Sequence, residues 1–407
     1  MHASSSVGMR IEHTPLSRTA NAPPSWGRLA LLWLAGIDLR VTILAIPPVL
    51  PLIHHDLSLD EKAVATLTGL PVLLLGLGAI PGSLLISRIG PRRALISGLA
   101  LIAVASAARG VGPSNAMLFA MTLVMGIGVA VIQPAFPALV GEWFETGVGL
   151  ATAVYANGLI FGELLGAGLA LSVVVPMVHG SWGSSLAVWG ALVLITTFAV
   201  VFTTPHVPRE AHTPRALWWP DWHDPQTWRL GIMQGGLSAM YFGVNAFIPD
   251  YLHAMGRPEL VGPALTAING GQIPASLLLL VVAKHAIGRR SPLVMAALLA
   301  LVGLAGVLSP LPWLILTGAG VIGFAGAIAL ILMLALPPLL TETGDAHRLS
   351  AGMFTVGYSS AFFIPLVGGA IWDATHMVIM AFLPVILGAL TMIAMASSLN
   401  LAAARNR

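Results

Sequence analysis

The sequence predicts an all-α polytopic membrane protein with twelve transmembrane helices in two pseudo-symmetric six-helix bundles. Three observations lead to this fold class. The chain is 57% hydrophobic and only 9% charged, it contains about twelve apolar runs of spanning length, and motifs recur in its two halves. Soluble domains carry about a quarter charged residues, so these charges are too few to cover a water-facing surface. The lipid bilayer is therefore an expected partner, and nucleic acid is not.

The apolar runs give the positions of the expected spans. A spanning helix needs roughly 20 predominantly apolar residues, and we divided the runs at charges and at Gly, Pro and Asn clusters. In the first half, the spans are expected at about 29–53, 63–87, 93–111, 115–140, 147–175 and 184–204. In the second half, they are expected at about 229–254, 262–284, 291–309, 312–340, 349–372 and 377–401.

The basic residues predict the orientation in the membrane. With a cytoplasmic N-terminus, fifteen of the 19 Lys and Arg fall in cytoplasmic segments. Lys62, Arg109 and Arg257 fall on the opposite side, and Arg40 falls inside a span. Because cytoplasmic loops carry the excess of Lys and Arg, both termini are expected in the cytoplasm. The sequence thus predicts a multi-pass protein of a bacterial inner membrane, which we expect to be a monomer.

The longest connection between spans predicts the domain organisation. An N-terminal tail is expected at 1–27, a six-helix bundle at 28–204, a cytoplasmic linker at 205–228, a second bundle at 229–401 and a short tail at 402–407. Tryptophans in the linker alternate with Asp, His and Arg, a composition that suits the headgroup region of a bilayer. We interpret the linker as an interfacial anchor between the halves, and a docking or gating element is the alternative.

Two motifs recur across this divide. "SRIGPRR" (Ser87 to Arg93) follows the second span, and "HAIGRR" (His285 to Arg290) follows the eighth. "GLATAVY" ends at Tyr155 in the fifth span and "GMFTVGY" ends at Tyr358 in the eleventh, and both read G-x-x-T-x-x-Y. Matches at equivalent positions indicate a duplicated six-helix unit. In parallel repeats of this kind, substrate binds near the membrane midplane between halves that rock.

The loop after the second span resembles the signature of the major facilitator superfamily, G-x-L-x-D-R-x-G-R-R. The chain keeps Arg88, Arg92 and Arg93 in this frame, but it has Ser87 in place of the acid and an extra Pro91. The resemblance implies that this loop takes part in gating. Because the acid is missing, the charge relay of the superfamily is expected to be weaker here.

A closer resemblance is to the cyanate/nitroimidazole transporter branch, whose first span reads N-L-R-P-x-x-x-x-x-G-P-x-L. Here the stretch is "DLRVTILAIPPVLP", with Asp38 in place of Asn. "GIGVAVIQPAFPALVGEWF", "GLATAVYANG" and "LSAGMFTVGYSSAFFIPLVGGAIWDAT" look like the fourth, fifth and eleventh spans of that branch. The resemblance extends from residue 28 over nearly the whole chain. It implies a secondary active transporter that works by alternating access.

Prolines interrupt the first, fourth, seventh and tenth spans, which the resemblance places around a central cavity. Broken backbone is tolerated at membrane depth where protein or a water-filled cavity satisfies the freed carbonyls. Five of these prolines are predicted to allow conformational gating: Pro47, Pro48, Pro134, Pro137 and Pro337. The alternative is that prolines are simply common in membrane helices.

Arg40 is the charge placed deepest in the first span. An arginine at a helix centre costs about 2.5–3.5 kcal/mol on the insertion scale, so it must face a cavity or a partner. Asp38 or Glu163 could form an ion pair with it, but residues two positions apart point to different faces of a helix. The fork of donors on a guanidinium suits small planar anions. Arg40 is therefore predicted to bind an anionic substrate.

Glu163 is the other deep charge. Because desolvation favours the protonated form of a carboxyl, Glu163 is predicted to carry a coupled proton, with Asp38 next in line. The alternative is a static partner for Arg40. The predicted substrate-binding set adds hydrogen-bonding side chains within the spans to Arg40: Gln133, Tyr155, Tyr241, Asn245 and Tyr358. The alternative for each of them is hydrogen bonding between helices.

The sequence thus predicts proton-coupled uptake of a small polar or anionic solute, such as cyanate, a small carboxylate or a nitroimidazole. The alternative is a proton-driven exporter of drugs or cations with the same fold. An enzyme is not expected, because the chain has no Cys, no HExxH motif and no Gly-Lys-Ser/Thr phosphate loop. No cofactor or metal is expected.

Overall fold

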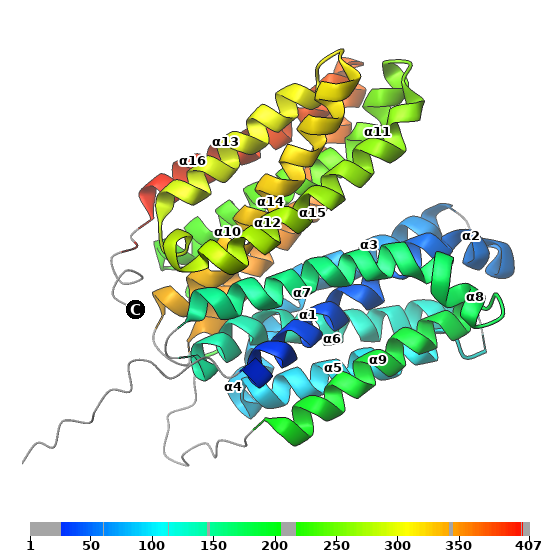
Figure 1. Cartoon of the computed structure of the whole chain (residues 1–407), viewed down its shortest axis with the longest axis vertical. Helices are drawn as coiled ribbons and strands as arrows, with labels where there is room; N and C mark the ends of the chain where they lie inside the picture. The colour runs from blue at the N-terminus through cyan, green and yellow to red at the C-terminus, as the bar shows by residue number, and fades with distance from the viewer. Residues whose placement is uncertain are drawn as a thin grey trace, which may run out of the picture.

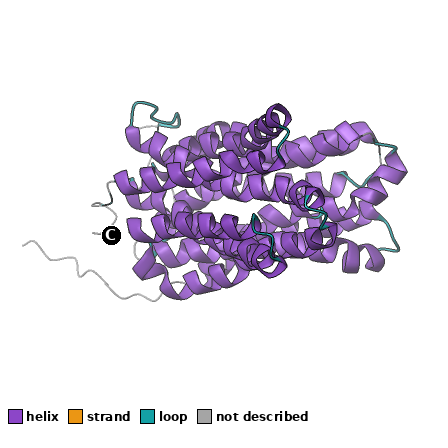
Figure 2. Ribbon diagram, turned by 90° about the horizontal axis from the view of Figure 1, so that it is seen from above, coloured by secondary structure: helices purple, strands orange, loops and turns teal. Residues whose placement is uncertain are grey.

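The structure, a computed structural model, describes residues 26–59, 61–112, 114–144, 147–204, 217–341, 345–399 and 401. Over these residues all regular elements are helices, and they form two bundles (Figures 1 and 2). The tail predicted at 402–407 lies outside the described residues, as do almost all of the tail predicted at 1–27 and the first half of the predicted linker.

The N-terminal bundle contains the first six spans. The first comprises α1 (Trp26–Leu44) and α2 (Ile46–Leu57), and the second comprises α3 (Glu61–Leu77) and α4 (Ala79–Ile89). The third and fourth spans are α5 (Pro91–Ala108) and α6 (Asn115–Trp143). The fifth consists of α7 (Val148–Leu169), the π-helical turn η1 (Ala170–Val174) and α8 (Val175–Met177), and the sixth is α9 (Trp182–Thr203).

The C-terminal bundle contains the remaining six. It begins with α10 (Pro225–Ser238), the π-helical turn η2 (Ala239–Gly243) and α11 (Val244–Ala254). The short 3₁₀ helix η3 (Pro258–Leu260) leads into α12 (Val261–Ala286), which is followed by α13 (Arg290–Val307) and α14 (Pro312–Leu340). The last two spans are α15 (Ala346–Thr375) and η4 (Val378–Phe382) with α16 (Leu383–Ser398).

The predicted all-α fold with two six-helix bundles is confirmed over the described residues. Among the described residues, ten spans are each long and apolar enough to cross a bilayer, and the pair α3–α4, which is bent by 54°, gives an eleventh. The remaining span, α10–η2–α11, is interrupted by its π-helical turn and carries polar residues that face the space between the bundles. A polar wall of this kind is expected where a helix borders a cavity rather than lipid.

Glycines fix the approach of α1 to α7. A Cβ at Gly36 would overlap the carbonyl oxygen of Tyr155, and a Cβ at Gly162 would overlap the backbone of Ile37. Small residues allow membrane helices to pack backbone against backbone. This close packing places the next turn of α1, with Arg40, beside Glu163, the residue that follows Gly162.

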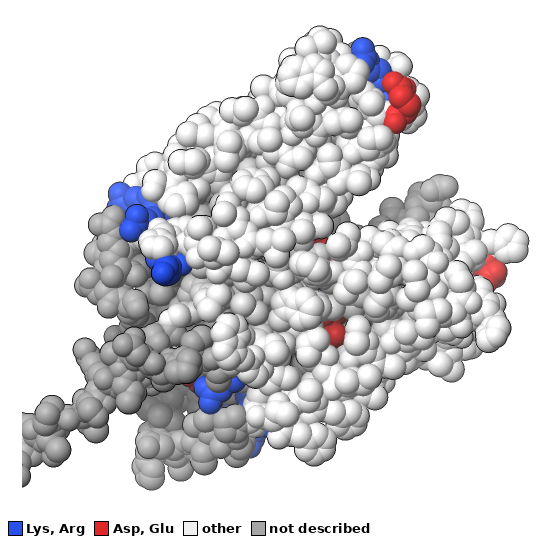
Figure 3. Space-filling model, in the orientation of Figure 1, with Lys and Arg blue, Asp and Glu red and all other residues white. Residues whose placement is uncertain are grey.

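The two bundles meet at one end and diverge towards the other, where α2 and α11 lie (Figure 1). At the closed end, where α1 begins and α16 ends, α15 packs on α3, α4 and α6. Ile160, Ala275 and Ala327 form a small apolar cluster across the two halves. The Lys and Arg side chains visible in Figure 3 gather mainly at this closed end, which is the charge asymmetry of a cytoplasmic face.

The second part of the predicted linker contacts both halves at the closed end. Ser83 of α4 donates a hydrogen bond to the carbonyl oxygen of Trp218 over 2.7 Å. Arg348 of α15 donates to the carbonyl oxygen of Trp219 over 2.6 Å and lies 3.4 Å from a carboxylate oxygen of Asp221. We refer to Trp218, Trp219 and Asp221, with these two partners, as the linker latch.

Candidate functional site

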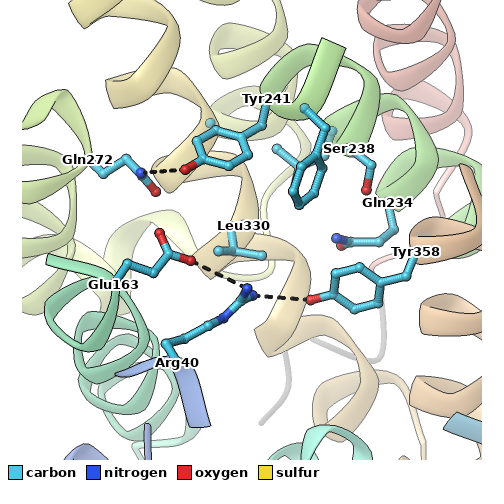
Figure 4. A pocket seen from close by; sticks show the side chains of 11 residues that line it. Arg40, Glu163, Gln234, Ser238, Tyr241, Gln272, Leu330 and Tyr358 are labelled. Atoms are coloured by element: carbon cyan, nitrogen blue, oxygen red, sulfur yellow. Dashed lines mark hydrogen bonds and ion pairs between the residues drawn. The ribbon is translucent and has the colours of Figure 1, made fainter. Parts of the chain in front are cut away.

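A cavity lies between the two bundles. The N-terminal half contributes Arg40 from α1 and Glu163 from α7 (Figure 4). The C-terminal half contributes five polar side chains, namely Gln234, Ser238, Tyr241, Gln272 and Tyr358. Among the described residues that line this cavity, all formal charge therefore comes from one half and all neutral hydrogen-bonding groups come from the other.

Arg40 and Glu163 form an ion pair in the wall of the cavity. Arg40 Nη1 lies 3.4 Å from Glu163 Oε1, and the two side chains are 10% and 20% exposed. At this distance and an effective dielectric constant of about 20, their attraction is on the order of 5 kcal/mol. Arg40 Nη2 also donates to the hydroxyl of Tyr358 over 3.5 Å, which links α1 to α15 across the halves. The ion-pair partner of Arg40 is thus Glu163 rather than Asp38.

Asp38 points away from the cavity. It is 1% exposed, and it is not among the residues that line the cavity. Its Oδ2 has no hydrogen-bond partner within the described part of the chain. Because Asp38 and Arg40 are two residues apart on α1, their side chains emerge on different faces of the helix. The position of Asp38 does not favour the proton-carrying role that was predicted as second choice.

A π-helical turn presents Tyr241 to the cavity. π-turns within α-helices occur frequently at functional sites, and η2 contains Tyr241 at its centre. The Tyr241 hydroxyl donates to Asn269 Oδ1 over 2.7 Å and accepts a bond from Gln272 Nε2 over 3.3 Å. Asn245, predicted to contact substrate, instead donates its amide to the backbone oxygen of Tyr241 over 2.8 Å. It holds the turn and does not line the cavity.

The other predicted substrate-binding residues lie at different depths. Tyr358 lines the cavity with Arg40 and Tyr241. Gln133 lies behind it and donates to its hydroxyl over 3.2 Å, while being only 1% exposed itself. Tyr155 is buried within the N-terminal bundle, where its ring stacks on Phe136 with centroids 4.8 Å apart. The structure thus brings Arg40, Tyr241 and Tyr358 together and leaves Tyr155 outside the cavity wall.

A wider space of about 970 Å³ adjoins the cavity on the side where the bundles diverge. We call it the vestibule. It shares Arg40, Glu163 and Tyr241 with the cavity and is also lined by Asn245 and Arg109. Arg109, predicted to lie among the basic residues of the opposite face, is fully buried. It is held at the end of α5 because it donates to the carbonyl oxygen of Thr42 over 3.1 Å.

The predicted gating prolines fall into two groups. Pro47 and Pro48 lie in the first turn of α2, directly after the break at Ala45, and Pro47 lines the vestibule. Pro134 and Pro137 within α6, and Pro337 within α14, are buried. Pro338, beside Pro337, lies next to Gly141 where α6 meets α14 across the two halves. Pro47 and Pro48 thus lie at a helix break, and Pro337 lies beside a residue at the contact between the halves, where bending would alter access.

Of the arginines in the loop after α4, Arg92 forms hydrogen bonds within its own half. Arg92 donates to Thr204 Oγ1 over 2.6 Å and to the carbonyl oxygen of Val201 over 2.9 Å, which caps the end of α9. Arg93 lies in the first turn of α5, and Arg88 is exposed at the end of α4. Near this loop, Ser83 of α4 donates its hydrogen bond to Trp218 of the linker.

Sequence reasoning missed Gln234 and Ser238, which both line the cavity from α10. A signal for them was present, because two polar residues four positions apart share one face of the second half of α10, which is otherwise Gly-rich and apolar. Polar residues in a spanning segment face the interior or a water-filled space. The spacing of these two side chains is therefore enough to indicate that α10 borders a polar cavity.

Two six-helix bundles around a central polar cavity are the architecture of a secondary membrane transporter. The model of the family described as Major Facilitator Superfamily matches residues 32–365. The chain therefore belongs to the major facilitator superfamily, whose members are membrane transporters rather than enzymes. It is a multi-pass membrane protein with a small-molecule substrate.

Relatives in the predicted branch support this assignment. The cyanate transport protein CynX of Escherichia coli (strain K12) is 28% identical, over 84% of this chain and 89% of its own length. The 2-nitroimidazole transporter of the same strain is 29% identical, over 86% of this chain and 90% of its own. The crystal structure of the transporter FucP in its outward conformation has a TM-score of 0.72 at 12% identity, covering 91% of this chain and 98% of FucP. At that identity, the structural likeness shows the fold alone.

Proposed function

We propose that the protein takes up a small anionic or polar solute together with a proton, by alternating access between the two bundles. The observation that carries this proposal is the Arg40–Glu163 ion pair in the wall of the central cavity. Arg40 is the proposed anchor for the negative or electron-rich end of the solute. Glu163 is the proposed carrier of the proton.

The ion pair couples the two ligands because both act on the same guanidinium. While Glu163 is ionised, it competes with an incoming anion for the donors of Arg40. A proton on Glu163 removes this competitor and leaves Arg40 free to bind the anion, so the net charge of the filled cavity equals that of the empty one. By linkage, the proton strengthens anion binding and the anion strengthens proton binding to the same extent.

The proposed orientation gives an external solute access to the site. With the basic, closed end in the cytoplasm, both termini are cytoplasmic and the vestibule opens to the outside of a bacterial inner membrane. An external anion and an external proton would then reach Arg40 and Glu163 directly. We propose that the transporting unit is a monomer.

The solute is proposed to be small. The names of the two relatives assign cyanate to one and 2-nitroimidazole to the other, and both are compact polar molecules. A proton-driven exporter of lipophilic cations is favoured less, because such a site needs an unpaired acid. The carboxylate that lines the described cavity is paired with Arg40.

Binding and uptake measurements on four variants test the proposal. Calorimetry with cyanate, nitrate, formate and acetate should show tighter binding at pH 6 than at pH 8, because protonation of Glu163 frees Arg40. Arg40→Lys loses the bidentate fork, so binding should weaken, and Arg40→Ala should nearly abolish it. Removal of a hydrogen bond to a charged group costs about 1.5–3 kcal/mol, roughly ten- to a hundred-fold in affinity.

Glu163→Gln mimics the protonated acid and separates binding from coupling. It should bind the anion with little dependence on pH, and it should lose uptake driven by a pH gradient. Asp250→Asn, which alters an exposed acid on α11, is the matched control and should behave as the unmodified protein. Unchanged affinity in a folded Arg40→Ala protein would refute the anchor. Gradient-driven uptake by Glu163→Gln would refute the proton carrier.

A further inference from the structure

The C-terminal wall of the cavity contains two buried side chains with unpartnered oxygens. Gln234 and Ser238 lie four residues apart on α10, and each is 2% exposed. Both line the cavity, and Figure 4 shows the Gln234 amide extending into it on the side opposite Glu163. Within the described residues, Gln234 Oε1 and Ser238 Oγ have no hydrogen-bond partner. Such groups lose their hydration on burial, so a ligand that bonds them recovers that free energy.

Packing holds the Gln234 side chain in this position. A Cβ at Gly357 of α15 would overlap Cβ and Cγ of Gln234. The glycine therefore leaves room for the Gln234 side chain between α10 and α15. The next residue, Tyr358, completes the wall beside it and bonds Arg40. Because α10 and α15 fix the stem of Gln234, its amide is presented to the cavity in a defined orientation.

One position in the wall of the same cavity has no side chain. Gly326 of α14 lines the cavity, and a Cβ there would meet no atom within 4 Å. Leu237, Phe242 and Leu330 supply apolar atoms around the same space. The same cavity therefore offers a donor, an acceptor and room for an apolar or flat group.

We infer that Gln234, Ser238 and Gly326 form an uncharged subsite for the end of the substrate opposite its anionic group. This inference rests on the proposed function, because it takes the binding of the anionic end by Arg40 as given. A bare inorganic anion at Arg40 would leave Gln234 and Ser238 unpartnered. An organic anion that carries a hydroxyl, an amide or a ring nitrogen would pair with them. The substrate class is thus a small organic acid with a hydrogen-bonding group on its uncharged part.

Matched ligand pairs test the polar part of the subsite on the purified full-length protein. Lactate and propionate differ by one hydroxyl, so the ratio of their affinities isolates the contribution of the subsite. Pairing a buried unpartnered group should favour lactate by about 5- to 100-fold in the unmodified protein. Ser238→Ala together with Gln234→Leu should bring this ratio close to one while leaving propionate affinity within about twofold. Ser97→Ala, whose hydroxyl bonds its own helix, should retain the full ratio.

A second variant tests the open wall at a position where an added Cβ meets no atom within 4 Å. Gly326→Val should weaken benzoate binding by about tenfold or more and leave formate within about twofold, because only the larger acid reaches the filled space. Gly168→Val is the matched control. Gly168 also has no atom within 4 Å of a built Cβ, but it is exposed on α7 away from the cavity, so it should affect neither acid.

The outcomes separate this inference from the proposed function. Equal affinities for lactate and propionate in the unmodified protein, or a preference that persists in the double variant, would overturn the subsite. If Arg40→Ala abolishes binding of all four acids while the subsite variants change no ratio, the anion anchor stands and the subsite is refuted. If the unmodified protein binds none of these acids, cyanate or nitrate, both are refuted.

Discussion

Ser83→Ala should loosen the end of the molecule at which the two bundles meet. The Ser83 side chain is fully buried, and its hydroxyl donates to the carbonyl oxygen of Trp218 over 2.7 Å. Loss of one neutral hydrogen bond costs about 0.5–1.5 kcal/mol. This bond forms only when the two bundles are in contact at this end. Its loss should therefore raise the fraction of molecules that are open at this end about 2- to 13-fold.

The ion pair of the linker latch should stabilise the closed state less than the hydrogen bond of Ser83 does. The Arg348 and Asp221 side chains are 21% and 47% exposed, and exposed pairs contribute only about 0–1 kcal/mol. Asp221→Asn should therefore change the open population by less than Ser83→Ala does. This ranking distinguishes a latch that acts through the buried bond from one that acts through surface charge.

Cysteine labelling measures the effect directly, because the chain contains no Cys of its own. Ala275 is fully buried in the apolar cluster between the halves. In the Ala275→Cys background, reaction with a maleimide requires opening of the closed end, so the labelling rate follows the open population. Adding Ser83→Ala should raise this rate by the factor given above. Ser97→Ala, in the same background, is the control for loss of a serine hydroxyl.

Two results would refute the reasoning about the linker latch. The first is an unchanged labelling rate in Ser83→Ala. The second is an equal rise in Ser97→Ala, whose hydroxyl bonds only within α5, since this would show a general loosening of the bundle. Either result would favour the interpretation of the linker as an interfacial anchor between the halves.

Three further changes test other contacts. Asn157→Leu removes a 2.9 Å bond to Ser276 that crosses the halves, so labelling at the closed end should rise about 2- to 13-fold, and an unchanged rate would contradict this. Arg109→Gln removes a positive charge from the vestibule, so stopped-flow association of acetate should slow at low salt and converge with the unmodified protein at high salt. Equal salt dependence would exclude electrostatic steering. Gly162→Val forces a side chain into the backbone of α1 and should lower the free energy of unfolding by about 1–3 kcal/mol. Thermal melts should show this loss, with Gly168→Val unchanged.

Composition and span length predicted the fold because lipid imposes strong constraints. Every spanning segment must satisfy its own backbone, so apolar length alone locates most helices. Charge at membrane depth is equally informative, and it identified Arg40 and Glu163, which line the cavity. Helix spacing also separated Arg40 from Asp38, and the structure places Glu163, not Asp38, beside the guanidinium.

Other parts of the site depend on departures from regular α-helical geometry, which the sequence period does not predict. Tyr241 and Asn245 are four residues apart and were expected to share a face. The π-helical turn η2 inserts an extra residue per turn at this point, and the Asn245 amide bonds the backbone of Tyr241 instead. A regular 3.6-residue period therefore places Tyr241 in the cavity wall correctly, whereas Asn245 lines the adjoining vestibule instead.

The duplicated motif was misleading for a different reason. Tyr155 and Tyr358 hold equivalent positions in the two halves, yet only Tyr358 lines the cavity. α7 packs against α1 so closely that its Tyr155 turn faces the inside of its own bundle, where Tyr155 stacks on Phe136. Sequence symmetry predicts equivalent helices, but the rotation of each helix about its axis is set by its packing.

This loss of symmetry gives the two halves different tasks in the proposed mechanism. Arg40 and Glu163 lie on α1 and α7, which pack closely at glycines. The charged pair is therefore expected to move as one rigid body during alternating access. Tyr358, on α15 of the other half, bonds Arg40 across the cavity while Gln133 bonds the same hydroxyl from α6. An anion that binds Arg40 must compete with Tyr358 as well as with Glu163. In the proposed mechanism, substrate binding at Arg40 therefore alters a contact between the halves and the site for the proton in the same step.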